Sequence, residues 1–425
     1  MEYKITKLKN GGRIITAPIK DTEIFAIIIG IRVGSRDEAE EQAGIAHFIE
    51  HMFFKGTKKR PSPLNVSKDL DGLGAHFNAF TSQEMTGFYI ECQQEKQAEA
   101  VEILFDMLDN NLFDRQEIEK EKGVICEEIN MYEDMPQAKV YDEFLRLLYP
   151  DNSLGRFIAG SKKTVNSLCR EDMLAFEKKH YSSGKMAIAL AGKINQKTIE
   201  FVEKKLKSRK AEKPLPYSVN PHTHKGVGVN TNKNRTGFIK RTNTEHTKVI
   251  KKKVDQAHIA LGFPTFSLKD ERRFTLAVLD NILGGMMSSK LFYEVRVKKG
   301  LAYYINSSVN FFTDTGYIAV RAGLAKTKLD YGLEAIEKQL LNFTKTKISE
   351  ADLARSKQNF VGNFYLGLEG SLEVAKYLIE QELLENKIEI PNFVVNQIEK
   401  VSKNDIMFLA KDIFQKDKMR LAIVR

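Results

Sequence analysis

Hydrophobic and polar positions in the first half of the chain switch repeatedly between the two-residue period of strands and the longer period of helices. Residues 3–17 alternate around the turn Asn10-Gly11-Gly12, which predicts a hairpin. The apolar, β-branched run at residues 24–33 predicts a buried strand. Further strands are predicted at residues 77–80, 87–92 and 186–191. Helices are predicted at residues 61–73, 96–108, 141–148 and 172–180. This mixture predicts an α+β fold built on mainly antiparallel sheets.

The pattern changes at about residue 207. Between residues 207 and 243, Pro, Asn, Gly and basic residues occur with little periodicity, which predicts a linker between domains. We therefore expect an N-terminal domain at residues 1–206 and a C-terminal domain at residues 244–425.

The C-terminal domain repeats features of the N-terminal domain. The run Thr86-Gly87-Phe88-Tyr89-Ile90 resembles Thr315-Gly316-Tyr317-Ile318, and a helical pattern follows each run. Such internal similarity predicts two homologous domains, each with an antiparallel sheet packed against helices.

Composition limits the class of protein. Apolar residues make up 42% and charged residues 29% of the 425 positions, and no apolar run approaches the roughly 18 residues of a membrane span. We expect no membrane association. The N-terminus has no hydrophobic signal segment, and the few, widely spaced cysteines indicate reduced thiols, so we expect a cytoplasmic location.

The net charge of +10 admits a nucleic-acid partner as an alternative. However, no nucleic-acid-binding motif accompanies the charge, which comes mostly from lysine. We therefore expect a lysine-rich, solvated surface and no nucleic-acid partner.

One segment carries candidate metal chemistry. His47, Glu50 and His51 fall on about one third of the circumference of a predicted helix. The remaining circumference is apolar and able to pack, through Ile45, Phe48, Ile49 and Met52. Two imidazoles one helical turn apart are able to bind one zinc ion, and the carboxylate between them is placed to take a proton from water. The order His-x-x-Glu-His is the inverzincin pattern.

A third ligand is predicted on an acidic helix further along the chain. Glu121 and Glu128 are two turns apart and share a stripe with Val124 and Ile125, which we expect to face inward. A carboxylate on an inward stripe needs a partner, and a metal would provide one. Glu128 is the candidate ligand with Glu121 behind it, and Glu127 is the alternative ligand.

With these motifs the sequence resembles the pitrilysin and insulysin family of zinc peptidases. It is most similar to the two-domain branch, which includes the mitochondrial processing peptidase and its bacterial relatives. Further matching segments are residues 53–57, 74–81 and 119–125. The resemblance spans essentially the whole chain.

The resemblance implies one Zn²⁺ per chain, held by His47, His51 and Glu128, because the family spacing favours Glu128 over Glu127. It implies a zinc-dependent endopeptidase acting on oligopeptides or unfolded precursor segments. Glu50 would be the general base that takes a proton from a zinc-bound water.

The second half lacks the metal motif, since its matching segment at residues 274–283 contains no histidine. In the family a comparable segment leads into an arginine and a tyrosine at a fixed spacing, which Arg296 and Tyr303 match. The resemblance implies that Tyr303 stabilises the oxyanion and that Arg296 holds a substrate carbonyl. By sequence alone, a surface arginine and a core tyrosine would be the simpler interpretation.

Substrate is expected to bind beside the zinc helix. If the strand containing Phe77, Asn78, Ala79 and Phe80 lies at a sheet edge, an extended peptide could pair with it through backbone hydrogen bonds. Such pairing recognises little sequence.

The resemblance also implies a partner. Long family members carry four such domains and this chain has two, so we expect it to pair with a second copy in a clamshell-like homodimer. A heterodimer with a related chain is the alternative. A non-catalytic peptide-binding or scaffolding subunit is the alternative function.

Overall fold

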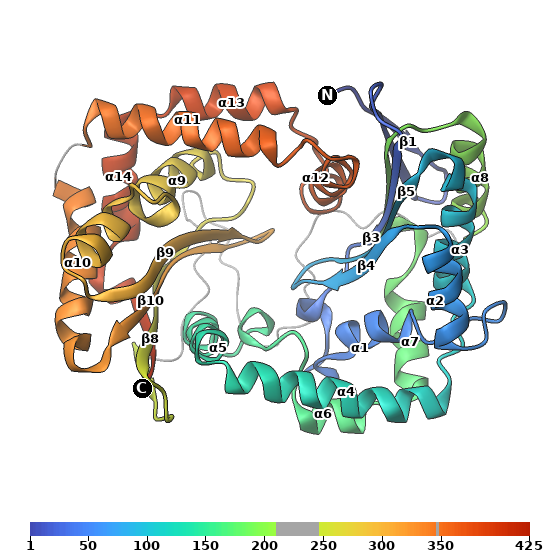
Figure 1. Cartoon of the computed structure of the whole chain (residues 1–425), viewed down its shortest axis with the longest axis horizontal. Helices are drawn as coiled ribbons and strands as arrows, with labels where there is room; N and C mark the ends of the chain where they lie inside the picture. Colours follow the sequence, from blue (N-terminus) through green and yellow to red (C-terminus); the bar gives the residue numbers. More distant parts are fainter. Residues whose placement is uncertain (210–245, 346–347) are drawn as a thin grey trace, which may run out of the picture. The chain divides into compact units, whose positions relative to one another are not determined.

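The computed structural model describes residues 1–209, 246–345 and 348–425 (Figure 1). The predicted linker at 207–243 therefore lies almost wholly outside the described residues. The first half of the chain contains β1 (Lys4–Lys7), β2 (Arg13–Pro18), β3 (Ile24–Ile31), α1 (Ile45–Met52), α2 (Pro63–Gly72), β4 (His76–Thr81), β5 (Thr86–Gln93), α3 (Gln97–Asp109), α4 (Arg115–Asp134), α5 (Pro136–Leu148), α6 (Lys162–Ser167), α7 (Arg170–His180), β6 (Met186–Gly192) and α8 (Gln196–Lys207).

The second half contains β7 (Thr247–Ile250), β8 (Gln256–Thr265), α9 (Arg273–Asp280), the π-helical turns η7 (Asn281–Gly285) and η8 (Phe292–Val297), β9 (Ala302–Phe311), β10 (Gly316–Ala325), α10 (Leu329–Lys345), α11 (Glu350–Leu366), α12 (Ser371–Leu384), α13 (Pro391–Lys400), α14 (Lys403–Ile413) and β11 (Arg420–Val424). The strands and helices predicted in the first half are confirmed, with ends that shift by a few residues.

The chain forms two compact units. Unit 1 holds the described residues of Met1–Asn130, Arg156–Thr223 and Leu366–Glu389. Unit 2 holds those of Met131–Gly155, His224–Tyr365 and Ile390–Arg425. Neither unit is one continuous stretch of sequence.

Each unit contains one mixed, mainly antiparallel sheet. The order in unit 1 is β1-β2-β6-β3-β5-β4, and the order in unit 2 is β7-β11-β8-β10-β9. The parallel pair β2 and β6 corresponds to the parallel pair β7 and β11, and the other neighbours are antiparallel in both sheets. This matching topology confirms the α+β prediction and the internal duplication.

Each sheet is covered on one face by a helix from the other half of the sequence. In unit 1, α12 packs on β3, β6 and β2 (Figure 1), and its Leu378 and Ile379 join a buried cluster with Ile28. In unit 2, α5 packs on β8 and β11, and its Phe144 lies in a buried cluster with Tyr317. The two halves of the sequence therefore exchange one covering helix.

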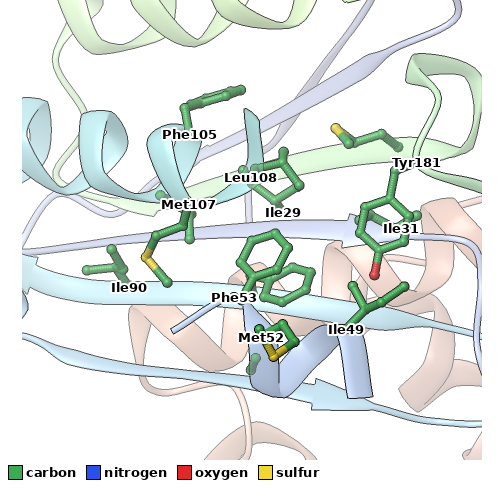
Figure 2. Close-up of a cluster of buried hydrophobic side chains, with 14 of the residues drawn as sticks. Ile29, Ile31, Ile49, Met52, Phe53, Ile90, Phe105, Met107, Leu108 and Tyr181 are labelled. Carbon is green, nitrogen blue, oxygen red and sulfur yellow. The ribbon is translucent and has the colours of Figure 1, made fainter. Parts of the chain in front are cut away.

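The predicted zinc helix is α1, and its apolar side anchors it in the core of unit 1. Ile49, Met52 and the following Phe53 point into the cluster drawn in Figure 2 and are fully buried. The rings of Phe53 and Phe88 stack with centroids 3.7 Å apart. Each such side chain contributes about 1.5–3 kcal/mol on burial, so packing fixes which side of α1 carries the histidines.

Within the described ranges, no helix combines the length and the apolar character that crossing a membrane would require.

Candidate active site

The helix α1 is held at its N-terminus by a side chain from the preceding loop. Gly44, the N-cap, has a φ of 98° and offers no capping side chain. A Cβ there would lie 2.6 Å from the Ala159 carbonyl oxygen, so the position requires glycine. Glu38 supplies the cap instead, accepting hydrogen bonds from the Gly44 N–H at 2.8 Å and the Ala46 N–H at 2.9 Å.

Glu38 is 2% exposed. Burial raises the pKa of its carboxyl to about 8, while the two backbone N–H groups favour the ionised form. The sequence analysis missed this residue, and its only signal was an acidic side chain shortly before the helix.

His47, His51 and Glu128 converge on one point in unit 1. The two Nε2 atoms lie 3.3 Å apart. Glu128 Oε2 lies 3.7 Å from Nε2 of His47 and 3.5 Å from Nε2 of His51. These residues form the only group of metal-ligand type found among the described residues.

The spacing of these atoms fits zinc. Tetrahedral ligands at about 2.0–2.2 Å from one ion lie about 3.3–3.6 Å from each other. Two of the observed separations, 3.3 and 3.5 Å, fall in this range, and the third, 3.7 Å, lies just above it. Three ligands of the types His, His and Glu also leave a fourth position open, as in catalytic zinc sites.

The pKa values of the two histidines are shifted in opposite directions. Burial, helped by the neighbouring His51, lowers the pKa of His47 to about 4. Burial also disfavours the charged form of His51, but hydrogen bonds with Glu121 and Glu128 outweigh it and raise its pKa to about 9. In the metal-free protein at neutral pH, His51 is therefore positively charged, with both ring nitrogens protonated, and His47 is neutral.

Glu121 supports the site from behind His51. It is 3% exposed, and its Oε1 lies 2.8 Å from His51 Nδ1. Its second oxygen pairs with Lys55 Nζ at 2.6 Å. Burial would raise the pKa of Glu121, but these hydrogen bonds hold it below its usual value. An ionised Glu121 fixes His51 with Nε2 toward the metal position. Sequence reasoning did not identify Lys55, although it lies in one of the matching segments.

Glu50 lies on α1 between the histidines and outside the ligand group. Its Oε2 accepts a hydrogen bond from Thr81 Oγ1 at 2.5 Å. Burial raises the pKa of Glu50, and the Thr81 bond opposes that shift. A carboxyl with a raised pKa beside an open metal position is suited to general-base chemistry. Thr81, on β4, was not predicted as a site residue.

The predicted substrate strand is β4, which lies at the edge of the unit 1 sheet. It pairs with β5 on one side, and no described strand pairs with its other side. Ala79 is buried in the cluster that contains the apolar face of α1, and Phe77 packs against it. Phe80 packs on the opposite face, in the cluster beneath α12. Asn78 is exposed.

The helix α4 differs from the prediction in one respect. Val124 is 52% exposed, so the expectation that it faces inward is wrong. The buried stripe runs instead through Glu121, Ile125 and Ile129, and Glu128 lies at its rim. Glu127, the alternative ligand, is exposed and accepts a hydrogen bond from Asn130, outside the ligand group.

Arg296 and Tyr303 belong to unit 2, whereas the zinc-ligand group and Glu50 belong to unit 1. Arg296 is exposed in the π-helical turn η8, with its guanidinium carbon 4.8 Å from the ring centroid of Phe292. Tyr303 is 74% exposed, so the interpretation as a core tyrosine is wrong. It is the extra residue at a β-bulge, because Tyr304 pairs with Gly323 and Ala302 with Leu324. Bulges and π-turns often redirect side chains at functional sites.

Known protein families and relatives match this chain over most of its length. The family description "Insulinase (Peptidase family M16)" matches residues 13–162, and "Peptidase M16 inactive domain" matches residues 167–360. "Uncharacterized zinc protease YmxG" from Bacillus subtilis is 33% identical over 409 residues, covering 96% of this chain and 95% of the relative. "Uncharacterized zinc protease SCO5738" from Streptomyces coelicolor is 31% identical, covering 96% of this chain and 86% of the relative.

Solved structures share the fold. A protease from Helicobacter pylori superposes with a TM-score of 0.89 at 23% identity, covering 100% of this chain and 99% of that one. A peptidase M16 inactive domain from Pseudomonas fluorescens gives 0.87 at 15% identity, covering 100% and 98%. The inactive-domain match agrees with α9, which has no histidine where α1 has two. From its sequence relatives, its fold and the His-x-x-Glu-His motif, the chain belongs to peptidase family M16, the insulinase or pitrilysin family.

Proposed function

We propose that this protein is a zinc-dependent endopeptidase that hydrolyses peptide bonds in oligopeptides or unfolded precursor segments. The observation that carries the proposal is the convergence of His47, His51 and Glu128 at zinc-ligand spacing, with Glu50 held beside them by Thr81. The names of its relatives as zinc proteases support the same conclusion.

Each residue has a defined task in this proposal. His47, His51 and Glu128 would hold one zinc ion, which would make water a better nucleophile and polarise the scissile carbonyl. Glu50 accepts the proton of the attacking water and donates it to the leaving amine. Glu121 keeps His51 in the tautomer that directs Nε2 to the metal.

Backbone pairing with β4 would align the substrate. The unpaired edge of β4 offers N–H and C=O groups to an extended peptide, and Thr81 links this strand to Glu50. The same strand would therefore bind the substrate and orient the base.

Arg296 and Tyr303 are proposed to serve the reaction, with Arg296 holding a substrate carbonyl and Tyr303 donating a hydrogen bond to the oxyanion. We further propose a homodimer of this chain, because long family members join four such domains in one chain and this chain has two. A cytoplasmic location is part of the proposal, supported by three free cysteines, Cys92, Cys126 and Cys169.

The test combines metal content with hydrolysis. Elemental analysis of the purified protein is expected to find about one zinc per chain. Glu50→Gln should keep the zinc and lose hydrolysis of a quenched fluorescent peptide, whereas the double variant His47→Ala/His51→Ala should lose both. Glu127→Gln, one position from the ligand Glu128, is the matched control and should keep both.

Three results would contradict parts of the proposal. Turnover in Glu50→Gln at the wild-type rate would remove the general base from the mechanism. Absence of zinc after remetallation, together with absence of hydrolysis, would instead favour the non-catalytic peptide-binding subunit. Sedimentation of the purified chain alone as a monomer would contradict the homodimer.

A further inference from the structure

One arginine in unit 2 lies partly buried without a counter-charge. Arg321 is on β10, and its guanidinium carbon lies 5.2 Å from the ring centroid of Tyr141 on α5. Its Nε atom is buried and has no hydrogen-bond partner. Within the described ranges, the guanidinium forms neither a hydrogen bond nor an ion pair. Burial of an unpaired donor is unfavourable, so the position calls for an acceptor.

Other arginines also bury an unpaired Nε atom, as Arg156 and Arg209 do, but their terminal nitrogens donate hydrogen bonds. Arg60 binds Asp69, Glu102 and Asp106. Among the described residues, Arg296, Arg321 and the exposed Arg425 form no side-chain hydrogen bond or ion pair. Arg296 is already assigned to the substrate, and like Arg321 it is held over an aromatic ring.

The side chains around Arg321 suit a carboxylate. Its direct neighbour on β9 is Asn306, which is exposed, and the next residue on that face is Tyr304. The Tyr304 hydroxyl lies 3.0 Å from His258 Nδ1, and burial lowers the pKa of His258, so this histidine is neutral. The neighbours across the strands therefore provide neutral amide, hydroxyl and imidazole groups around a single cation.

We propose that Arg321, with Asn306 and Tyr304, binds a carboxylate of the peptide substrate, either its C-terminus or an acidic side chain. The planar guanidinium is able to bind both oxygens of a carboxylate, and its cation–π contact with the Tyr141 ring helps to hold it in place. The proposal rests on the peptidase function proposed above. Asn306 lies three residues along β9 from Tyr303, or about 10 Å, so the bound carboxylate would lie within a few residues of a peptide bond placed at Tyr303.

The experiment measures binding separately from hydrolysis. Three N-terminally labelled peptides of one length are compared: a free acid without acidic side chains, its C-terminal amide, and the amide with one glutamate. Their affinities for the Glu50→Gln protein are measured by fluorescence anisotropy at fixed salt. The free acid, the glutamate peptide or both should bind about tenfold to one hundredfold more tightly than the plain amide.

The variant Arg321→Gln, in the Glu50→Gln background, should reduce that ratio to about one. Arg355→Gln is the matched control: it removes an exposed arginine of unit 2 that pairs with Asp352, and it should keep the ratio. Comparison of the free acid with the glutamate peptide distinguishes a C-terminal carboxylate from a side-chain carboxylate.

Equal affinity for all three peptides would overturn the proposal. So would a carboxylate preference that survives Arg321→Gln. The two proposals can fail separately. If the wild-type protein has no peptidase activity but still prefers carboxylate peptides in a way that depends on Arg321, the carboxylate site is supported and the catalytic function is refuted.

Discussion

The hydrogen bond from Thr81 to Glu50 gives a sharp test of how the base is oriented. Thr81→Val replaces the hydroxyl with a methyl group of similar size and removes the 2.5 Å contact to Glu50 Oε2. A hydrogen bond to a charged group contributes about 1.5–3 kcal/mol. Because each 1.36 kcal/mol corresponds to a tenfold change in rate, kcat/KM is expected to fall about tenfold to one hundredfold.

The same substitution should move the pH profile in a known direction. Burial raises the pKa of Glu50, and the Thr81 hydrogen bond lowers it by stabilising the carboxylate. Loss of the bond therefore raises this pKa further. The acidic limb of kcat/KM against pH should shift to higher pH, because the base must be ionised to accept a proton.

The assay is hydrolysis of a quenched fluorescent peptide across the pH range, with zinc content measured on the same samples. Thr81→Ser restores the hydroxyl and should recover most of the activity. Zinc content should stay unchanged in both variants, since Thr81 bonds to no ligand. A valine variant with wild-type kcat/KM and an unshifted profile would refute the reasoning. Loss of zinc in that variant would show that Thr81 maintains the metal site instead.

Three further predictions concern the metal, the helix cap and the exchanged helix. Because the pKa of His51 is raised to about 9, zinc must displace a proton from this side chain on binding. The zinc affinity, measured by competition with a chelator, should therefore fall about tenfold for each pH unit as the pH decreases from 8 to 6. A zinc affinity that does not change with pH would contradict this. Glu38→Ala leaves the Gly44 and Ala46 N–H groups without their acceptor. It should lower the free energy of unfolding of the zinc-free protein by about 1–3 kcal/mol, measured by urea denaturation. An unchanged denaturation midpoint would show that Glu38 does not stabilise the start of α1. A fragment of residues 1–209 lacks α12, so it should bind a hydrophobic dye and unfold without cooperativity. A cooperative unfolding transition in this fragment would show that unit 1 folds without α12.

The two histidines of the proposed metal site could be predicted from the sequence because their relative position is fixed by one helix. His47 and His51 are one turn apart, so any helix places them together. Glu128 lies on a different helix from the histidines, so its approach to them depends on tertiary packing. It was predicted over Glu127 only from the resemblance to the family. Val124 was placed wrongly because a seven-residue spacing defines a stripe but not its centre, and the stripe of α4 is centred on Ile125.

The supporting residues could not be predicted from sequence for a different reason. Thr81 reaches Glu50 from β4, and Lys55 reaches Glu121 from the end of α1, so both contacts depend on how separate elements pack. Neither residue type signals its partner, because a threonine in a strand and a lysine after a helix are ordinary on any surface. Arg321 is similar: only the packing of α5 shows that the arginine lies over Tyr141 without a carboxylate.

The exchange of α5 and α12 shows where pattern-based reasoning ends. An amphipathic helix shows that it must bury a face, but not which sheet receives it. Four large apolar side chains of α12 are buried in unit 1: Val374, Leu378, Ile379 and Leu383. At about 1.5–3 kcal/mol each, they contribute about 6–12 kcal/mol, comparable to the 5–15 kcal/mol that stabilises a typical domain. The unit that holds the proposed zinc ligands therefore depends on a segment that follows most of unit 2 in the sequence, although α13, α14 and β11 come after it. Metal binding by unit 1 should accordingly require a chain that extends through α12, which couples assembly of the proposed metal site to synthesis of most of unit 2.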